Sequence, residues 1–121
     1  MKEYPGIDIG VLGEGEHTFL ELIASIQYGN SLADVAGIIY RNGANITRNR
    51  NREFISNLDE LPFPAWDLIK PQSKYRLSAY GTKENDSFGL ITSRGCPGQC
   101  TFCDQSAFGR KFRAHSAEYV V

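Results

Sequence analysis

The chain has 121 residues, with 13 basic and 14 acidic side chains and a formal net charge of −1. This balance disfavours nucleic-acid binding, which relies on a broad positive field, and favours small-molecule chemistry. Apolar residues make up 41% of the chain, enough for a modest core, but no apolar run has the length of a membrane span. The first residues lack the apolar segment of a signal peptide, so we expect a cytoplasmic location.

The chain begins with the pattern of a strand, a glycine-rich turn and a helix. Residues 7–12 are partly β-branched and are followed by the turn Gly13-Glu14-Gly15-Glu16. From His17 onward, apolar residues recur at helical spacing, and Gly29-Asn30 predicts the end of the helix. We interpret His17 as an ordinary residue of the first helical turn, because no partner motif for a metal ligand accompanies it.

A β-hairpin is predicted in the middle of the chain. Residues 37–41 and 44–48 are β-prone and are joined by Asn42-Gly43, a strong hairpin signal. Ser31 and Asp34 predict a single capped helical turn just before them. The predicted fold class is therefore α+β, with a small mixed sheet, one main amphipathic helix and a central hairpin.

Residues 61–68 contain Pro62 and Pro64 and are predicted to be extended rather than helical. The segment 57–67, which overlaps them, is called the strap below. We expect Trp66 to pack on a neighbouring surface. An exposed loop is predicted at 83–86, and a strand at 88–92 that joins the first strand and the hairpin in one sheet.

Three cysteines, Cys96, Cys100 and Cys103, are the only cysteines of the chain. We interpret them as three thiolate ligands of one [4Fe–4S] cluster, which normally has four cysteine ligands, so one iron would be open to another ligand. One alternative is a zinc site completed by His115 or His17. The simplest alternative is that the three cysteines are free thiols. Glycine and proline around the first cysteine favour a specifically shaped loop. The residues alone leave the metal open.

Two further features complete the C-terminal part. Ser116 predicts the start of a helix. Basic side chains gather after the hairpin and after the cysteines, and because no net positive charge accompanies them we interpret both groups as solvated surface. The two groups are Arg48, Arg50 and Arg52, and Arg110, Lys111 and Arg113.

Residues 90–103, with the spacing CxxxCxxC and an aromatic before the last cysteine, closely resemble the signature loop of radical S-adenosylmethionine (SAM) enzymes. The resemblance implies that Cys96, Cys100 and Cys103 hold a [4Fe–4S] cluster whose fourth iron binds SAM, and that Phe102 lies beside the adenine. It also implies reductive cleavage of SAM to a 5′-deoxyadenosyl radical that attacks a small-molecule substrate, with an electron donor such as ferredoxin or flavodoxin.

The N-terminal part resembles the last strand, loop and helix of a cobalamin-binding domain. The strap resembles the connector of two-domain radical SAM enzymes, the group that contains the anaerobic magnesium-protoporphyrin monomethyl ester cyclase. By this resemblance cobalamin becomes a candidate cofactor, and Gly13 and Gly15 would contact its nucleotide tail, since glycine lets backbone approach a ligand closely. An ordinary strand-to-helix turn is the alternative at these two glycines.

The resemblance implies three parts: the end of a cobalamin-binding-like domain at 1–30, a hairpin and connector at 31–74, and the start of a radical SAM domain at 75–121. Because the remaining strands of both domains are not in the sequence, we expect a fragment that lacks most of a (β/α) barrel and is inactive alone. The cysteine loop is expected to be exposed. A non-catalytic zinc-binding or interaction module of the Cys3His type is the alternative function.

Overall fold

The computed structural model describes residues 1–69 and 89–121. Its strands and α-helices follow one another in the order β1 (Ile9–Val11), α1 (Glu16–Tyr28), β2 (Ile38–Asn42), β3 (Asn45–Arg48), β4 (Ser93–Arg94), β5 (Arg113–Ala114) and α2 (Ala117–Val120). Short 3-10 turns occupy Leu32–Asp34, Leu58–Glu60 and Trp66–Leu68. Among the described residues, no helix combines the length and the apolar character that crossing a bilayer requires.

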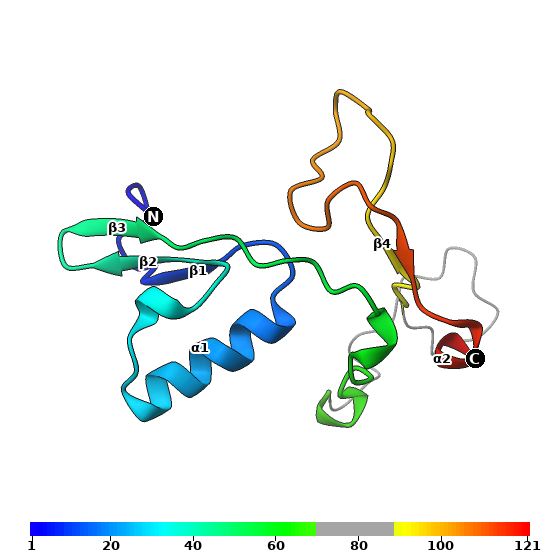
Figure 1. The fold of residues 1–121 in the computed structure, drawn as a ribbon, viewed down its shortest axis with the longest axis horizontal. Helices are drawn as coiled ribbons and strands as arrows, with labels where there is room; N and C mark the ends of the chain where they lie inside the picture. Colours follow the sequence, from blue (N-terminus) through cyan, green and yellow to red (C-terminus); the bar gives the residue numbers. More distant parts are fainter. Residues whose placement is uncertain (70–88) are drawn as a thin grey trace.

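The N-terminal half is a three-stranded antiparallel sheet in the order β1-β2-β3, with α1 along one side (Figure 1). Ile9 pairs with Tyr40 on the one side of β2, and Ile39 pairs with Arg48 on the other. The core contains Leu22 of α1 together with Val35, Ile38 and Tyr40. These elements confirm the predicted strand, helix and hairpin. α1 ends at Tyr28, and Gly29 follows it in the left-handed conformation, so the predicted end of the helix is confirmed too.

The chain between β3 and the strap crosses from the sheet to the C-terminal part of the molecule, where the strap lies (Figure 1). The strap has no α-helix or strand, and it begins beside a second small core of Ile55, Leu58 and Leu61. Phe63 stacks on Tyr119 of α2 with ring centroids 4.4 Å apart. Apolar packing therefore anchors the strap through Leu58 and Leu61 and again through Phe63.

The C-terminal strands form a sheet of their own. β4 pairs only with β5, antiparallel, with Arg94 opposite Arg113. The prediction of one mixed sheet was wrong: every strand pair in the described residues is antiparallel, and β4 is not joined to β1. The physical reason is that the chain returns after the cysteines, so β5 satisfies the backbone of β4 locally. The predicted loop at 83–86 and Phe88 lie outside the described residues. The predicted strand at 88–92 was wrong in its described part: residues 89–92 form no strand, and β4 begins at Ser93.

Candidate metal-binding site

The three cysteines lie on a loop that projects from the end of the β4–β5 pair, away from the sheet and α1 (Figure 1). All three side chains are free and exposed, as expected for this loop. Gly98 lies between two of the thiols: a Cβ built on it would be 3.3 Å from the sulfur of Cys96 and 3.8 Å from that of Cys100. The missing side chain at Gly98 therefore leaves space between these two sulfurs.

The loop does not hold the thiols in a finished coordination geometry. Among residues 1–69 and 89–121, no three His, Cys, Asp or Glu side chains are grouped closely enough to hold a metal ion. The donor set itself fits an iron–sulfur cluster, because it consists of three soft thiolates on one exposed segment. Ligation and local folding are coupled at such sites, so binding can draw the thiolates together.

The base of the loop is closely packed. Gly95 has φ +79°, and a Cβ built on it would lie 2.1 Å from the carbonyl oxygen of Lys111. The Cys96 N–H donates to the carbonyl of Gly109 at 3.3 Å, and the Gln105 side-chain amide donates to the carbonyl of Gly98 at 2.7 Å. The shaped loop predicted from glycine and proline is thus fixed where it meets β4 and β5.

His115, the candidate fourth ligand of a zinc site, is used elsewhere. Its Nδ1 lies 3.0 Å from Oδ1 of Asp59, and its ring stacks on Tyr119 at 4.1 Å. The His115 side chain is only 7% exposed, whereas the three cysteines are exposed. His17 lies in the first turn of α1, as expected. Within the described residues, neither histidine supports the zinc alternative.

Phe102 and the two glycines of the predicted cofactor contacts differ in their surroundings. Phe102 is 91% exposed on the cysteine loop, so its ring face is available to a ligand. Gly13 has φ +72° and lies near the carbonyl of Ala107 and the ring of Phe54. Gly15 lies beside Val11. The positive φ gives Gly13 a role in the turn itself, so a cobalamin contact at Gly13 and Gly15 stays a prediction.

A buried ion-pair cluster beneath the loop was not predicted. Glu14 accepts hydrogen bonds from Arg113 Nη1 at 2.9 Å to both carboxylate oxygens, and from Arg94 Nη1 at 3.1 Å. The side chains of Glu14 and Arg113 are 3% and 4% exposed. The interpretation of Arg113 as solvated surface was therefore wrong. Its neighbours 110 and 111 are exposed, as expected.

Electrostatics keep this cluster ionised. Burial alone raises the pKa of Glu14, but hydrogen bonds from Arg113, the Ile55 N–H and Arg94 outweigh it and hold the pKa below its ordinary value. Arg94 also pairs with Glu16 at 2.5 Å, and burial there is likewise outweighed, so the pKa of Glu16 is lowered. The cluster joins residues 80 and 99 positions apart. Such separations cannot be read from one sequence, although one arginine precedes the cysteines and the other follows them.

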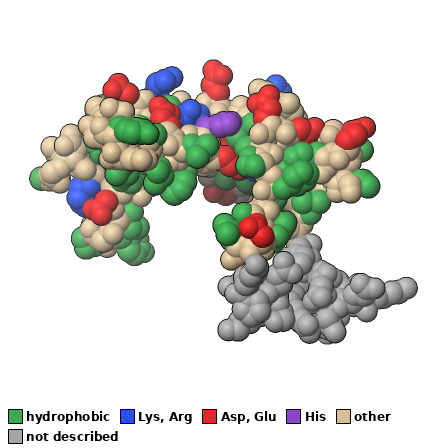
Figure 2. Space-filling view, turned by 90° about the horizontal axis from the view of Figure 1, so that it is seen from below, with side chains coloured by type: hydrophobic (Ala, Val, Ile, Leu, Met, Phe, Trp, Pro, Cys, Tyr) green, Lys and Arg blue, Asp and Glu red, His purple; other side chains and the backbone are tan. Residues whose placement is uncertain are grey.

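A largely apolar cavity of about 810 Å³ lies between α1, the strap and the chain before β4. Leu20 of α1, Trp66 of the strap and Leu90 are among its lining residues, together with Arg94 and His115. Figure 2 shows the face seen from below, hollowed between its two halves, with hydrophobic side chains on either side. Trp66 is 36% exposed and lines this cavity.

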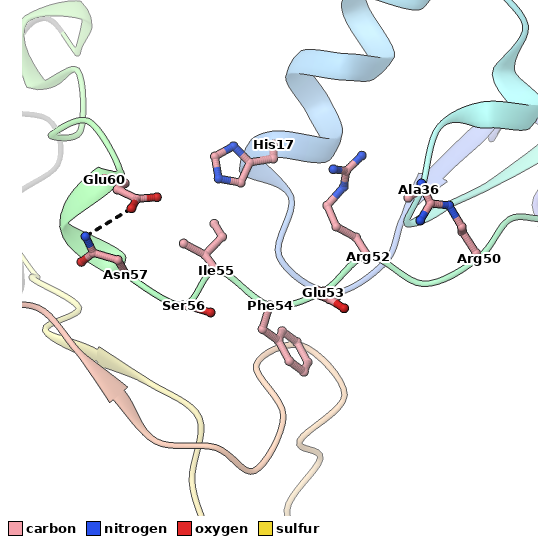
Figure 3. Close-up of a pocket in the computed structure, with 10 residues that line it drawn as sticks. All are labelled: His17, Ala36, Arg50, Arg52, Glu53, Phe54, Ile55, Ser56, Asn57 and Glu60. Atoms are coloured by element: carbon pink, nitrogen blue, oxygen red, sulfur yellow. Dashed lines mark hydrogen bonds between the residues drawn. The ribbon is translucent and has the colours of Figure 1, made fainter.

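A second, more polar cavity of about 480 Å³ lies on the strap side of α1 (Figure 3). His17, Arg52 and Glu60 line it, and Asn57 donates to Glu60 at 3.3 Å. Figure 3 shows Phe54 pointing away from His17, toward the segment that follows the cysteines. Arg52 is itself tied to α1, because its Nε donates to Thr18 Oγ1 at 2.8 Å and its guanidinium pairs with Glu21.

No protein-family model matches the chain. Curated relatives do: the chain is 40% identical to an uncharacterised methyltransferase of Pyrococcus horikoshii over its whole length, covering 25% of that protein. It is 37% identical over 93% of its length to the anaerobic magnesium-protoporphyrin IX monomethyl ester cyclase of Synechocystis, covering 21% of it. The hopanoid C-3 methylase of Methylococcus capsulatus is 32% identical over 95% of the chain, which covers 21% of that protein.

A solved structure shares the fold. The radical SAM methyltransferase TsrM of Kitasatospora setae superimposes with a TM-score of 0.61 and 24% identity, over 98% of this chain and 23% of TsrM. One TsrM structure contains tryptophan and a SAM analogue, and another contains cobalamin and a [4Fe–4S] cluster. The homologues of the chain are thus methyltransferases and magnesium-protoporphyrin monomethyl ester cyclases, and the chain spans about a quarter of their length.

Proposed function

We propose that the chain is the junction segment of a radical SAM enzyme, in which Cys96, Cys100 and Cys103 are the protein ligands of a [4Fe–4S] cluster. The observation that carries the proposal is the exposed cysteine loop on a fixed base, with Gly98 leaving space between two sulfurs. Three cysteines leave one iron for another ligand. The likeness to segments of methyltransferases and cyclases supports SAM as that ligand.

When bound, the cluster and SAM supply the one-electron chemistry that releases methionine and a 5′-deoxyadenosyl radical. The protein's part is to bind and orient. The three thiolates would hold the cluster on the loop, and Gly95 and Gln105 hold the loop on its base. The exposed ring of Phe102 is available to stack on the adenine.

Residues 1–30 would be the end of a cobalamin-binding-like domain, 31–74 the connector and 75–121 the start of the radical SAM barrel. In this arrangement Gly13 and Gly15 would face the nucleotide tail of cobalamin. The cobalamin-containing structure of TsrM supports this assignment by its shared fold. We propose methyl transfer or oxidative cyclisation of a small molecule for the whole enzyme, with ferredoxin or flavodoxin as electron donor, and no turnover by this segment alone.

Anaerobic reconstitution with iron and sulfide tests the ligand assignment. We expect a brown protein with about four iron and four sulfide per chain, because a cubane cluster has that composition. Cys100→Ala is expected to lose most of the bound iron, since two protein ligands remain. Thr101→Ala, an exposed neighbour without a thiol, is the matched control and should keep the cluster. A colourless protein with one zinc and no sulfide would contradict the proposal.

Incubating the reconstituted protein with SAM and a reductant tests whether this segment alone cleaves SAM. Because the segment spans about a quarter of its relatives, we expect no 5′-deoxyadenosine above background. Product formation that depends on all three cysteines would show that this segment alone supports SAM cleavage.

A further inference from the structure

One carboxylate holds three segments of the chain together beneath the cysteine loop. Glu14 belongs to the turn before α1, and it accepts the backbone N–H of Ile55, just before the strap, at 2.6 Å. The same carboxylate accepts from Arg94 before the cysteines and from Arg113 after them. Both ends of the loop are thus bonded to a single side chain of the N-terminal half.

The two arginines need such a partner. Arg94 and Arg113 face each other across the β4–β5 pair, where like charges directly opposite are destabilising. Glu14 supplies the opposite charge at this position, and Glu16 binds the second nitrogen of Arg94. Nη2 of Arg113 donates to the carbonyl of Phe108 at 2.9 Å, so Arg113 also fixes the returning side of the loop.

Aromatic rings complete this base. The Arg94 guanidinium lies 5.3 Å from the ring centroid of Phe108, and the Arg113 guanidinium lies 5.0 Å from that of Phe54. Gly109 lies so near the Phe54 ring that a built Cβ would be 2.6 Å from it. The segment just before the strap therefore contacts the loop through Phe54, at the place where Glu14 contacts it through the arginines.

We propose that Glu14 is a positioning residue for the cysteine loop: by bonding to both of its ends, it sets the position of the loop relative to the Gly13–Gly15 turn. This role rests on the proposed function in one respect: the cysteine loop is taken to bind a cluster. Its consequence is that the two candidate cofactor-binding segments, the cysteine loop and the glycine turn, are held as one rigid body. Glu14 itself is not required as a metal ligand.

Hydrogen exchange on the full chain without metal tests the positioning directly. Glu14→Gln keeps the volume of the side chain but removes its charge. We expect exchange in residues 94–114 to become about tenfold faster or more, because the loop loses the charge that binds both of its ends. β1, β2 and α1 should keep their protection, since segments of a protein open locally and independently. Glu21→Gln is the matched control. Glu21 of α1 also pairs with an arginine, Arg52, but this pair is far along the chain from the loop.

Iron release by a chelator tests the consequence for the cluster. After reconstitution, we expect Glu14→Gln to bind the wild-type amount of iron but to lose it about tenfold faster, with an altered electron paramagnetic resonance spectrum of the reduced cluster. Glu21→Gln should match the wild type in both. If the wild-type chain takes up no iron, the proposed function fails, while the exchange experiment still decides the role of Glu14.

Two results would overturn the inference. One is unchanged exchange in residues 94–114 of Glu14→Gln, and the other is equal acceleration over the whole chain, as expected for a merely stabilising ion pair. If circular dichroism shows that Glu14→Gln does not fold, Arg94→Gln replaces it, because it leaves the Glu14–Arg113 pair intact. The same local acceleration in Arg94→Gln supports the inference, and global or absent acceleration refutes it.

Discussion

Gly95 is the residue on which the shape of the cysteine loop depends most directly. Its φ of +79° disfavours a side chain, and a Cβ would lie 2.1 Å from the Lys111 carbonyl oxygen, closer than any real contact. We expect Gly95→Ala to lower the free energy of unfolding by more than the cost of about 1–2 kcal/mol for the left-handed backbone alone. Iron uptake should fall in parallel, because the chain must move at the base of the loop.

Gly43→Ala is the control for this prediction. Gly43 has φ +60°, but nothing lies within 4 Å of a built Cβ, so this variant carries the backbone strain without the clash. Urea unfolding of the two variants measures the difference. Equal destabilisation of Gly95→Ala and Gly43→Ala would show that the Lys111 contact relaxes at no cost.

At the scale of elements, the start of α2 is fixed by the strap. Asp59 accepts the backbone N–H of Ser116 at 3.1 Å and lies 3.0 Å from His115 Nδ1. Hydrogen bonds from Ser116, and to a lesser extent the interaction with His115, hold the pKa of Asp59 below its ordinary value. The carboxylate thus adds to the cap that the Ser116 hydroxyl provides by accepting the N–H of Tyr119.

We expect Asp59→Ala to lower the urea midpoint of unfolding and to speed hydrogen exchange in residues 115–121, because the helix start loses its acceptor. Asp34→Ala is the matched control: Asp34 ends another 3-10 turn, and its side chain is exposed. An Asp59→Ala protein with the exchange pattern of Asp34→Ala would show that the strap does not hold α2.

The elements that the sequence predicted well are those formed by neighbours in the chain. The hydrophobic period from His17 and the glycine at 29 predict α1, and Asn42-Gly43 predicts the hairpin. The partner of β4 was not predictable in this way. β5 lies 18 residues beyond β4 and has only two residues, Arg113 and Ala114, with no alternating pattern to mark a strand.

At the scale of the whole molecule, acid should weaken the connection between the two halves. The pKa of Glu14 is lowered in the folded chain, so its contribution to stability is complete above its ordinary value of 4.5 and is lost as the pH falls through the folded pKa. Glu16 faces Arg94 in the same cluster, and its lowered pKa acts in the same direction. Burial alone lowers the pKa of Arg94, but its hydrogen bonds to Glu16 and Glu14 outweigh burial and raise the pKa, so Arg94 stays charged over this range.

Urea unfolding of the wild type and Glu14→Gln over this pH range measures the effect. Near neutral pH we expect the variant to be less stable by about 3–5 kcal/mol, the cost of removing one partner of a buried pair. The difference should shrink as the pH falls below 4.5, because Glu14 of the wild type becomes neutral too. A difference that is constant with pH would show that the Glu14 charge does not stabilise the fold.

The sequence by itself predicted a shared metal site, and it determined the local elements. Cys96, Cys100 and Cys103 are close in the chain, so their spacing alone predicts a shared metal site, and backbone preferences of neighbouring residues predict α1 and the hairpin. Only the tertiary structure decided how the loop is held. Glu14 meets Arg94 and Arg113 across 80 and 99 positions, and burial excludes the water that would otherwise screen these charges.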